Sequence, residues 1–160
     1  MKYTKAVEMR FRRLTTKELD ILEKDFISFL ASNTITAGDW EKLKVEENEQ
    51  AEDLINMFSD IVLETSLKKV HFVEHCSKSE LMFFKCNPKE IILIGLRSKN
   101  SEIDLSEMDL GQLKTEMTAS FSTQKKYSKN REEEVFDMLN QGCSISDGKL
   151  FEALMNMKNV

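Results

Sequence analysis

The residue pattern with the most specific chemistry is His71-Phe72-Val73-Glu74-His75, which has the form H-x-x-E-H. In one class of zinc hydrolases, the two imidazoles of this motif bind the metal and the glutamate acts as a general base. On a helix, residues four apart share one face, so His71 and His75 could reach one ion, with Glu74 beside them. On a strand the two histidines lie about 13 Å apart, too far to share an ion. Because the surrounding residues are β-branched and aromatic, we favour a strand and keep the metal-dependent hydrolase as an alternative.

The cysteines supply the other soft ligands. Cys76 and Cys86 could join His75 in a thiol–imidazole cluster if a hairpin placed residue 76 opposite residue 86. Structural zinc normally takes four such ligands, and here there are three, so we expect thiols that pack as small hydrophobic side chains. Cys143 lies between two predicted helices, with no histidine near it in the sequence, and we expect an inert thiol rather than a nucleophile.

Two basic segments could contact nucleic acid. In the first, Arg10, Arg12 and Arg13 flank Phe11, a combination that can grip phosphates and stack on a base. The second segment, 125–131, contains three lysines and an arginine. The whole chain has 23 Lys and Arg against 28 Asp and Glu, a net charge of −5, which disfavours nucleic acid as the partner. We therefore expect the arginines to pair with acidic faces of neighbouring helices.

Composition excludes several classes of protein. With 160 residues, 41% of them hydrophobic, one Pro and five Gly, the chain is neither fibrous nor of low complexity. It has no glycine-rich phosphate loop and no serine-nucleophile motif, so we expect no cofactor and lean against an enzyme. The longest apolar run, Ile91–Leu96, is too short to cross a bilayer, and nothing at the N-terminus resembles a signal peptide. Three cysteines without a close pair fit reduced thiols in a cytoplasm.

The N-terminal part of the sequence has the periodicity of helices. Apolar residues recur at helical spacing over about 16–32, 37–46 and 49–68. Thr15 and Glu18 have the spacing of a capping box at the start of the first stretch. The third stretch has an acidic face opposite its apolar one. We expect three helices here.

The middle of the sequence changes to a strand pattern. Val70–Cys76, Leu81–Phe84 and Ile91–Leu96 are rich in β-branched, aromatic and aliphatic residues and are separated by short polar turns. Three such strands fit an antiparallel meander. Its apolar face needs cover, which the preceding helices can supply.

Helical signals return after the strands. The acidic stretch Ser101–Met117 predicts a short helix, and 119–127 could add a fourth strand. Asn130 is placed to cap a helix that ends near Gly142, and Ser146 to cap the last helix.

Several short stretches together resemble a known family. They are Arg10-Phe11-Arg12-Arg13-Leu14-Thr15, Ile35-Thr36-Ala37-Gly38-Asp39-Trp40, Phe58-Ser59-Asp60, Glu74-His75, and Gln141-Gly142-Cys143 with Gly148-Lys149-Leu150-Phe151. With them the chain resembles an uncharacterised bacterial protein family, a conserved domain of unknown function, over about residues 9–155. The resemblance implies a bacterial, soluble, single-domain protein and no particular chemistry. It also implies that the family's usual start is Met9, which would make residues 1–8 a mobile extension.

We therefore expect a small cytoplasmic α+β protein, with N-terminal helices, a small antiparallel β-meander and C-terminal helices. A single domain would span 15–157, after an N-terminal extension or arm of residues 1–14. The leading hypothesis is a non-enzymatic module that binds another protein, because catalytic motifs are missing while ten Phe and nine Met could line an apolar contact. Trp40 and Phe11, with the arginines around Phe11, are the candidate interaction residues. The sequence indicates no membrane contact and no particular oligomeric state.

Overall fold

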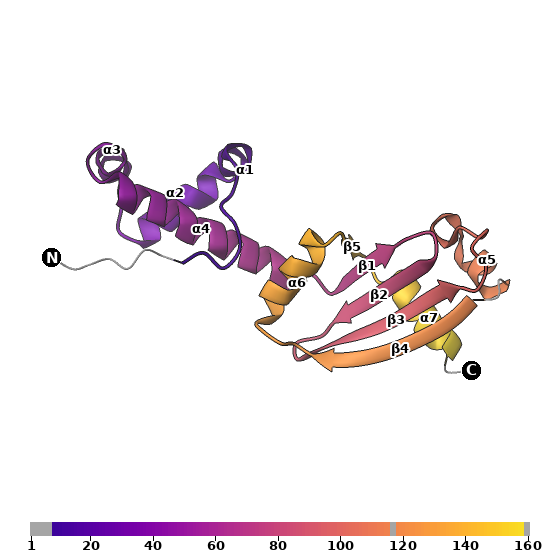
Figure 1. Ribbon diagram of the computed structural model, residues 1–160. Coiled ribbons are helices and arrows are strands. Elements are labelled where there is room, and N and C mark those ends of the chain that lie inside the picture. Colours follow the sequence, from indigo (N-terminus) through magenta and orange to yellow (C-terminus); the bar gives the residue numbers. More distant parts are fainter. Residues whose placement is uncertain (1–7, 116–117, 159–160) are drawn as a thin grey trace. The chain divides into compact units, whose positions relative to one another are not determined.

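The computed structural model describes residues 8–115 and 118–158 (Figure 1). As predicted, the fold is α+β: a central antiparallel sheet of five strands, with helices before and after it in the chain. Contacts between Cα atoms divide the chain into two compact units, Met1–Ser66 and Leu67–Val160, and each is described by itself. None of the described helices combines the length and the apolar character that crossing a bilayer requires. Residues 1–7 of the expected N-terminal extension lie outside the described residues.

The N-terminal unit is helical. Its elements are α1 (Thr16–Ile21), α2 (Glu23–Ser32), α3 (Ala37–Glu46) and α4 (Asn48–Lys68), the last of which continues into the second unit. The bounds of α3 and α4 match the predictions closely, but the single helix predicted over 16–32 is two helices. The chain breaks at Leu22, where ψ is 17°, although the apolar periodicity continues through this residue. Periodicity reports which face is buried and carries no signal for such a local break.

An aromatic cluster holds α2, α3 and α4 together. The ring centroids of Phe26 and Trp40 are 5.2 Å apart in a T-shaped arrangement, and those of Phe26 and Phe58 are 5.0 Å apart. Phe29 lies 5.5 Å from Phe58 by the same measure. Such pairs contribute about 0.5–1.5 kcal/mol beyond the area that they bury. Trp40, expected as an interaction residue, is half-buried and packs within this cluster.

The C-terminal unit is built on the sheet, whose strand order is β4-β3-β2-β1-β5. The strands are β1 (Phe72–Cys76), β2 (Glu80–Cys86), β3 (Glu90–Ser98), β4 (Thr118–Lys126) and β5 (Ser144–Ser146). The first four form the predicted meander, including the fourth strand. The short strand β5, which pairs with β1, was not predicted, because three residues with one apolar side chain give no periodic signal.

One face of the sheet carries the main core. Phe83 and Ile94 from the sheet pack with Phe151 and Leu154 of α7 (Lys149–Lys158), which passes behind the strands in Figure 1. Leu105, in the 3-10 helix η1 (Leu105–Glu107), is fully buried in the same core. The helix α5 (Leu110–Thr115) adds Leu113. We expected the helices that precede the sheet in the chain to cover this face. Within this unit, the segments that cover it are η1, α5 and α7, which all follow β3 in the chain.

The helix α6 (Arg131–Asn140) contributes the fully buried Val135, and its ends follow the sequence signals. The side chain of Asn130 accepts a hydrogen bond from the Glu132 N–H, and Gly142 has a φ of +106°, as expected beyond a helix C-terminus. The predicted cap of the last helix is wrong. Ser146 lies in β5, and α7 begins only at Lys149, after the turn at Gly148. That glycine has a φ of +80°, and a Cβ there would lie 2.5 Å from the ring of Phe72.

One largely buried guanidinium contacts four segments of the C-terminal unit. Arg131, whose side chain is 12% exposed, donates hydrogen bonds to the carbonyl oxygens of Leu67, Val70 and Cys86, at 3.2, 2.5 and 3.0 Å. It also donates to the Glu132 carboxylate at 3.3 Å. Arg131 therefore ties the start of α6 to the end of α4, the segment before β1 and the end of β2.

Replacing this arginine should destabilise the C-terminal unit. Arg131→Met removes the arginine donor from the carbonyls of Val70 and Cys86 and from a buried carboxylate, while the Leu67 carbonyl keeps its hydrogen bond from the Val70 N–H. We expect this loss to cost about 3–5 kcal/mol of unfolding free energy. Urea unfolding followed by far-UV circular dichroism measures this loss. Lys129→Met is the matched control, because it removes an exposed charge two residues away, worth at most about 1 kcal/mol. Equal stabilities of the two variants would contradict the role of Arg131.

Candidate functional site

The H-x-x-E-H segment is extended, as predicted. Glu74 and His75 lie in β1, and the exposed His71 directly precedes that strand. Successive side chains of a strand point to opposite faces, so Glu74 points away from the face that His75 occupies. Within the described residues, no three His, Cys, Asp or Glu side chains lie close enough together to hold a metal ion. The helical geometry that a zinc hydrolase of this type requires is therefore not present at this segment.

The cluster of His75 with two cysteines does not form. The tight turn at 77–79 pairs Cys76 with Leu81, whereas Cys86 lies at the far end of β2. Placing residue 76 opposite residue 86 would require a much longer hairpin loop. Burial raises the pKa of Cys86 to about 11, so this thiol stays protonated at neutral pH and behaves as a core side chain.

The structure instead brings His75 beside Cys143. Both residues line a hollow of about 330 Å³ between α6 and the sheet. The Cδ2 and Nε2 atoms of the imidazole are each 3.9 Å from the position that a Cβ on Gly142 would take. The pairing of β5 with β1 creates this proximity, and no sequence signal could have revealed it, because β5 itself was not predictable. Burial raises the pKa of the Cys143 thiol, which argues against a nucleophile activated by the imidazole.

A second hollow, of about 750 Å³, lies beside Arg131 and includes Lys85, His71 and Phe72 in its wall. Its charged groups are already engaged. The Lys85 ammonium is 3.1 Å from the Glu152 carboxylate and 5.6 Å from the centroid of the Phe72 ring. Arg131 also donates hydrogen bonds to main-chain carbonyls. The charged residues around this hollow therefore serve mainly to hold the segments of the unit together.

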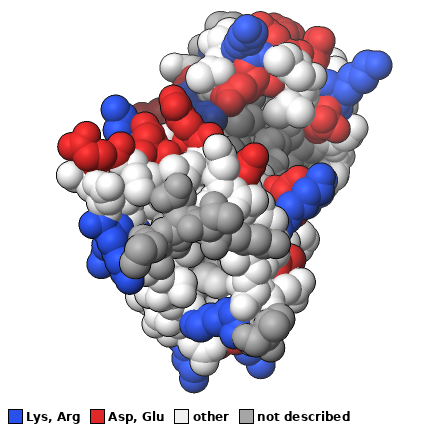
Figure 2. All heavy atoms as spheres, turned by 90° about the vertical axis from the view of Figure 1, so that its right-hand side faces the viewer, with Lys and Arg blue, Asp and Glu red and all other residues white. Residues whose placement is uncertain are grey.

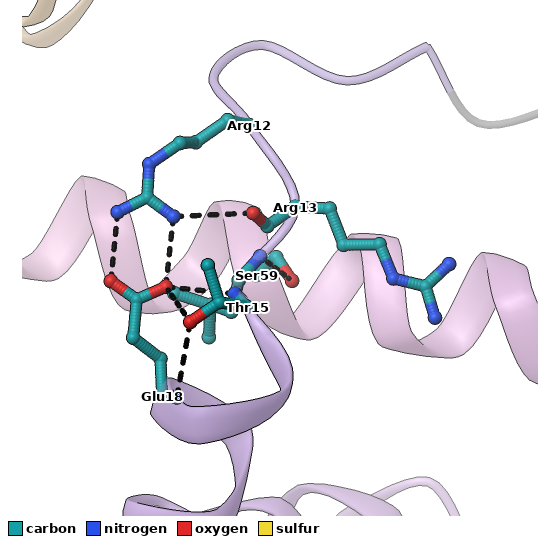
Figure 3. A network of polar contacts seen from close by, with 6 residues as sticks. Arg12, Arg13, Thr15, Glu18 and Ser59 are labelled. Atoms are coloured by element: carbon teal, nitrogen blue, oxygen red, sulfur yellow. Dashed lines mark hydrogen bonds and ion pairs between the residues drawn. The ribbon is translucent and has the colours of Figure 1, made fainter.

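The N-terminal basic segment forms a compact polar network with the start of α1 (Figure 3). Arg12 binds both carboxylate oxygens of Glu18, with N–O distances of 2.9 and 2.8 Å. The Thr15 N–H donates to the same carboxylate at 2.8 Å, and the Glu18 N–H donates to the Thr15 hydroxyl at 3.3 Å, which completes the predicted capping box. The Arg12 hydrogen bond is the largest cause that lowers the pKa of Glu18 to about 2.

The same segment, residues 10–15, lies along α4. We call it the N-terminal strap. The backbone N–H groups of Arg10 and Phe11 donate to the two carboxylate oxygens of Asp60, at 2.9 and 3.1 Å. The N–H of the buried Leu14 donates to the Ser59 hydroxyl at 3.1 Å. Residues 10–14 of the expected N-terminal extension or arm are therefore hydrogen-bonded to a helix. Phe11 is half-buried, with the Arg10 guanidinium carbon 5.2 Å from the centroid of its ring.

Each of the five arginines in the chain pairs with a carboxylate of the same unit, which confirms the expected pairing with acidic helix faces for the strap. The pairs are Arg10–Glu64, Arg12–Glu18, Arg13–Glu52, Arg97–Glu80 and Arg131–Glu132. In the second basic segment, Lys125 pairs with Glu134 and Lys129 with Asp137. On the face shown in Figure 2, the Lys and Arg side chains form separate groups rather than one continuous field. This face therefore shows no continuous basic stripe of the kind that nucleic-acid binding uses.

Comparison with known proteins identifies a family for this chain but does not identify an activity. The model of a family of unknown function (DUF6495) matches residues 9–159. This match confirms the resemblance to an uncharacterised conserved domain and begins at Met9, the family start that the sequence suggested. No curated protein and no solved structure matches the chain.

The Glu18 network predicts a defined pH dependence. The pKa of Glu18 is lowered on folding from 4.5 to about 2, so its charged form stabilises the fold above about pH 4.5, and this stabilisation is lost as the pH falls toward 2. Glu18→Gln keeps an oxygen for the capping box but loses the charge. Thermal unfolding should show a lower Tm than wild type at pH 7, with the difference vanishing near pH 2.

The matched control for this measurement is Glu23→Gln, which removes an exposed carboxylate from the first turn of α2. It should follow the wild-type pH profile. A Glu18→Gln profile parallel to wild type from pH 7 to pH 2 would show that the Arg12–Glu18 pair does not stabilise the strap.

Proposed function

The chain belongs to this family, whose function is not established, and we propose that it acts as a non-enzymatic module that binds another protein. The observation that supports this proposal most directly is a set of exposed apolar side chains on the helical unit. Five large apolar residues of α1–α4 are between 38% and 83% exposed: Ile21, Ile27, Val45, Met57 and Ile61. Exposed apolar side chains that gather on one surface are typical of protein contact sites.

Two of these residues define a contact stripe. Met57 and Ile61 are one helical turn apart on α4, so they share a face of that helix. The strap bonds to α4 through Asp60 and Ser59, and this leaves the Met57–Ile61 stripe exposed. Apolar residues spaced by four on an exposed helix are the anchors that partner proteins commonly contact. Binding through this stripe would also offset the cost of leaving apolar surface in water.

The earlier alternatives have less support. A metal-dependent hydrolase using His71, Glu74 and His75 would need a helix where β1 is extended. A nucleic-acid accessory factor would need guanidinium groups that are free, whereas those of the strap are paired. We also propose that the protein is bacterial and cytoplasmic. Its three free thiols fit a reducing compartment such as the cytoplasm. Trp40 and Phe11 stay candidates for the contact, although each already packs on a neighbouring side chain.

Affinity purification from the native cell tests the proposal. We expect the tagged chain to recover a specific protein partner, and Met57→Gln combined with Ile61→Gln to reduce that recovery at least about tenfold, equivalent to about 1.4 kcal/mol. Glutamine is a good helix former, so α4 should persist and the Tm should change little. Quantitative mass spectrometry of the recovered protein measures the effect.

The matched control removes the same two residue types from the C-terminal unit. Ile145→Thr combined with Met157→Gln deletes one exposed isoleucine and one exposed methionine there. This variant should recover the partner as wild type does. Absence of any specific partner for wild type, or equal losses with both double variants, would refute binding through the α4 stripe.

A further inference from the structure

The hollow between α6 and the sheet gathers four soft ligand groups. His75, Met82, Met138 and Cys143 all line this space of about 330 Å³. They supply one imidazole, one thiol and two thioethers. Unlike the His71, Glu74 and His75 set that the sequence offered to a zinc ion, this set contains no carboxylate.

The strand register places the first two groups. His75 and Met82 are direct partners in the antiparallel pairing of β1 and β2, so their side chains leave the same face of the sheet. Directly opposed residues have Cβ atoms about 5 Å apart, within reach of a long thioether side chain. Both residues are half-buried, so a bound ion would be partly shielded from water.

The end of α6 places the other two groups. The Cys143 N–H donates to the Met138 carbonyl at 3.1 Å, which folds the chain back through Gly142 and brings both sulfur-bearing residues to one helix end. The His75 Nε2 lies 3.9 Å from the position of a Cβ on Gly142, so the metal-binding edge of the imidazole faces this turn. Within the described part of the chain, neither the His75 ring nor the Cys143 thiol makes a hydrogen bond.

We propose that this hollow binds one monovalent copper ion through the Cys143 sulfur, the His75 imidazole and the thioethers of Met82 and Met138. Thiolate and thioether ligands select Cu(I), whereas calcium and magnesium require oxygen ligands. Zinc sites use Cys, His, Asp and Glu and do not use thioethers, so this donor set disfavours zinc.

Binding deprotonates the thiol. The Cys143 S–H bond breaks, a sulfur–copper bond forms, and the proton leaves to solvent, while copper stays in the +1 state. The charges of the thiolate and Cu(I) then cancel. Lys125, the charged residue in the wall of the hollow, is paired with Glu134, which limits its repulsion of a cation. This site goes beyond the proposed protein-binding role and does not depend on it.

Competition for Cu(I) under anaerobic conditions tests the site. The protein is titrated into the Cu(I) complex of bathocuproine disulfonate, and transfer is read from the loss of the complex's visible absorbance. We expect one equivalent of Cu(I) for wild type, affinity at least about 100-fold lower for Cys143→Ser, and about tenfold lower for Met82→Leu. Met82→Leu nearly conserves side-chain volume, so its fold should persist by circular dichroism.

The chain supplies matched controls for both ligand types. Cys76→Ser and His71→Asn change an exposed thiol and an exposed imidazole outside this hollow, and both should bind as wild type does. The proposal is overturned if wild type takes no Cu(I) from the competitor, or if a control variant loses as much affinity as Cys143→Ser. It is also overturned if Cys86→Ala abolishes binding while Met82→Leu leaves it unchanged, because the ion would then lie between two thiolates.

Discussion

Both units of this structure depend on arginine side chains that bind carboxylates and main-chain carbonyls of their own unit. In the N-terminal unit, Arg12 holds Glu18 at the start of α1, and the strap that carries Arg12 is hydrogen-bonded to α4 through Asp60. In the C-terminal unit, Arg131 satisfies carbonyl oxygens at the end of α4, before β1 and at the end of β2. A guanidinium suits this role because its planar set of five donors can serve several acceptors at once.

The same bonding also guides which functions we propose for the surface. An arginine that is paired with a carboxylate of its own chain must lose that pair before it can bind a phosphate, and for this reason we do not propose the strap as a nucleic-acid site. The remaining surface features are of two other kinds. Apolar side chains such as Met57 and Ile61 stay exposed on α4, and soft ligands such as His75 and Cys143 meet in a hollow of the sheet. These features are the basis of our two proposals, a protein partner and a soft metal ion.

Some local signals in the sequence predict the structure correctly, whereas the predicted cap at Ser146 is wrong and the pairing of β5 with β1 is not readable from the sequence. The capping box at Thr15 and the cap at Asn130 were correctly predicted, because they depend on residues at most three positions away. The proximity of His75 to Cys143 was missed, because it requires strand β5 to join the far edge of the meander. Cover of the sheet by α7 was missed for a different reason. An amphipathic helix reveals that it must bury a face but does not indicate which surface it will cover.

The most direct test of this account is whether the strap arginines are available to nucleic acid. A fluorescently labelled single-stranded RNA is titrated with the protein at about 50 mM and about 200 mM salt, and binding is followed by anisotropy. Because the guanidinium groups of Arg10, Arg12 and Arg13 are paired with carboxylates, we expect no binding at either salt concentration. Tight binding that weakens with salt, and that disappears when these arginines are replaced by glutamine in a folded variant, would contradict it.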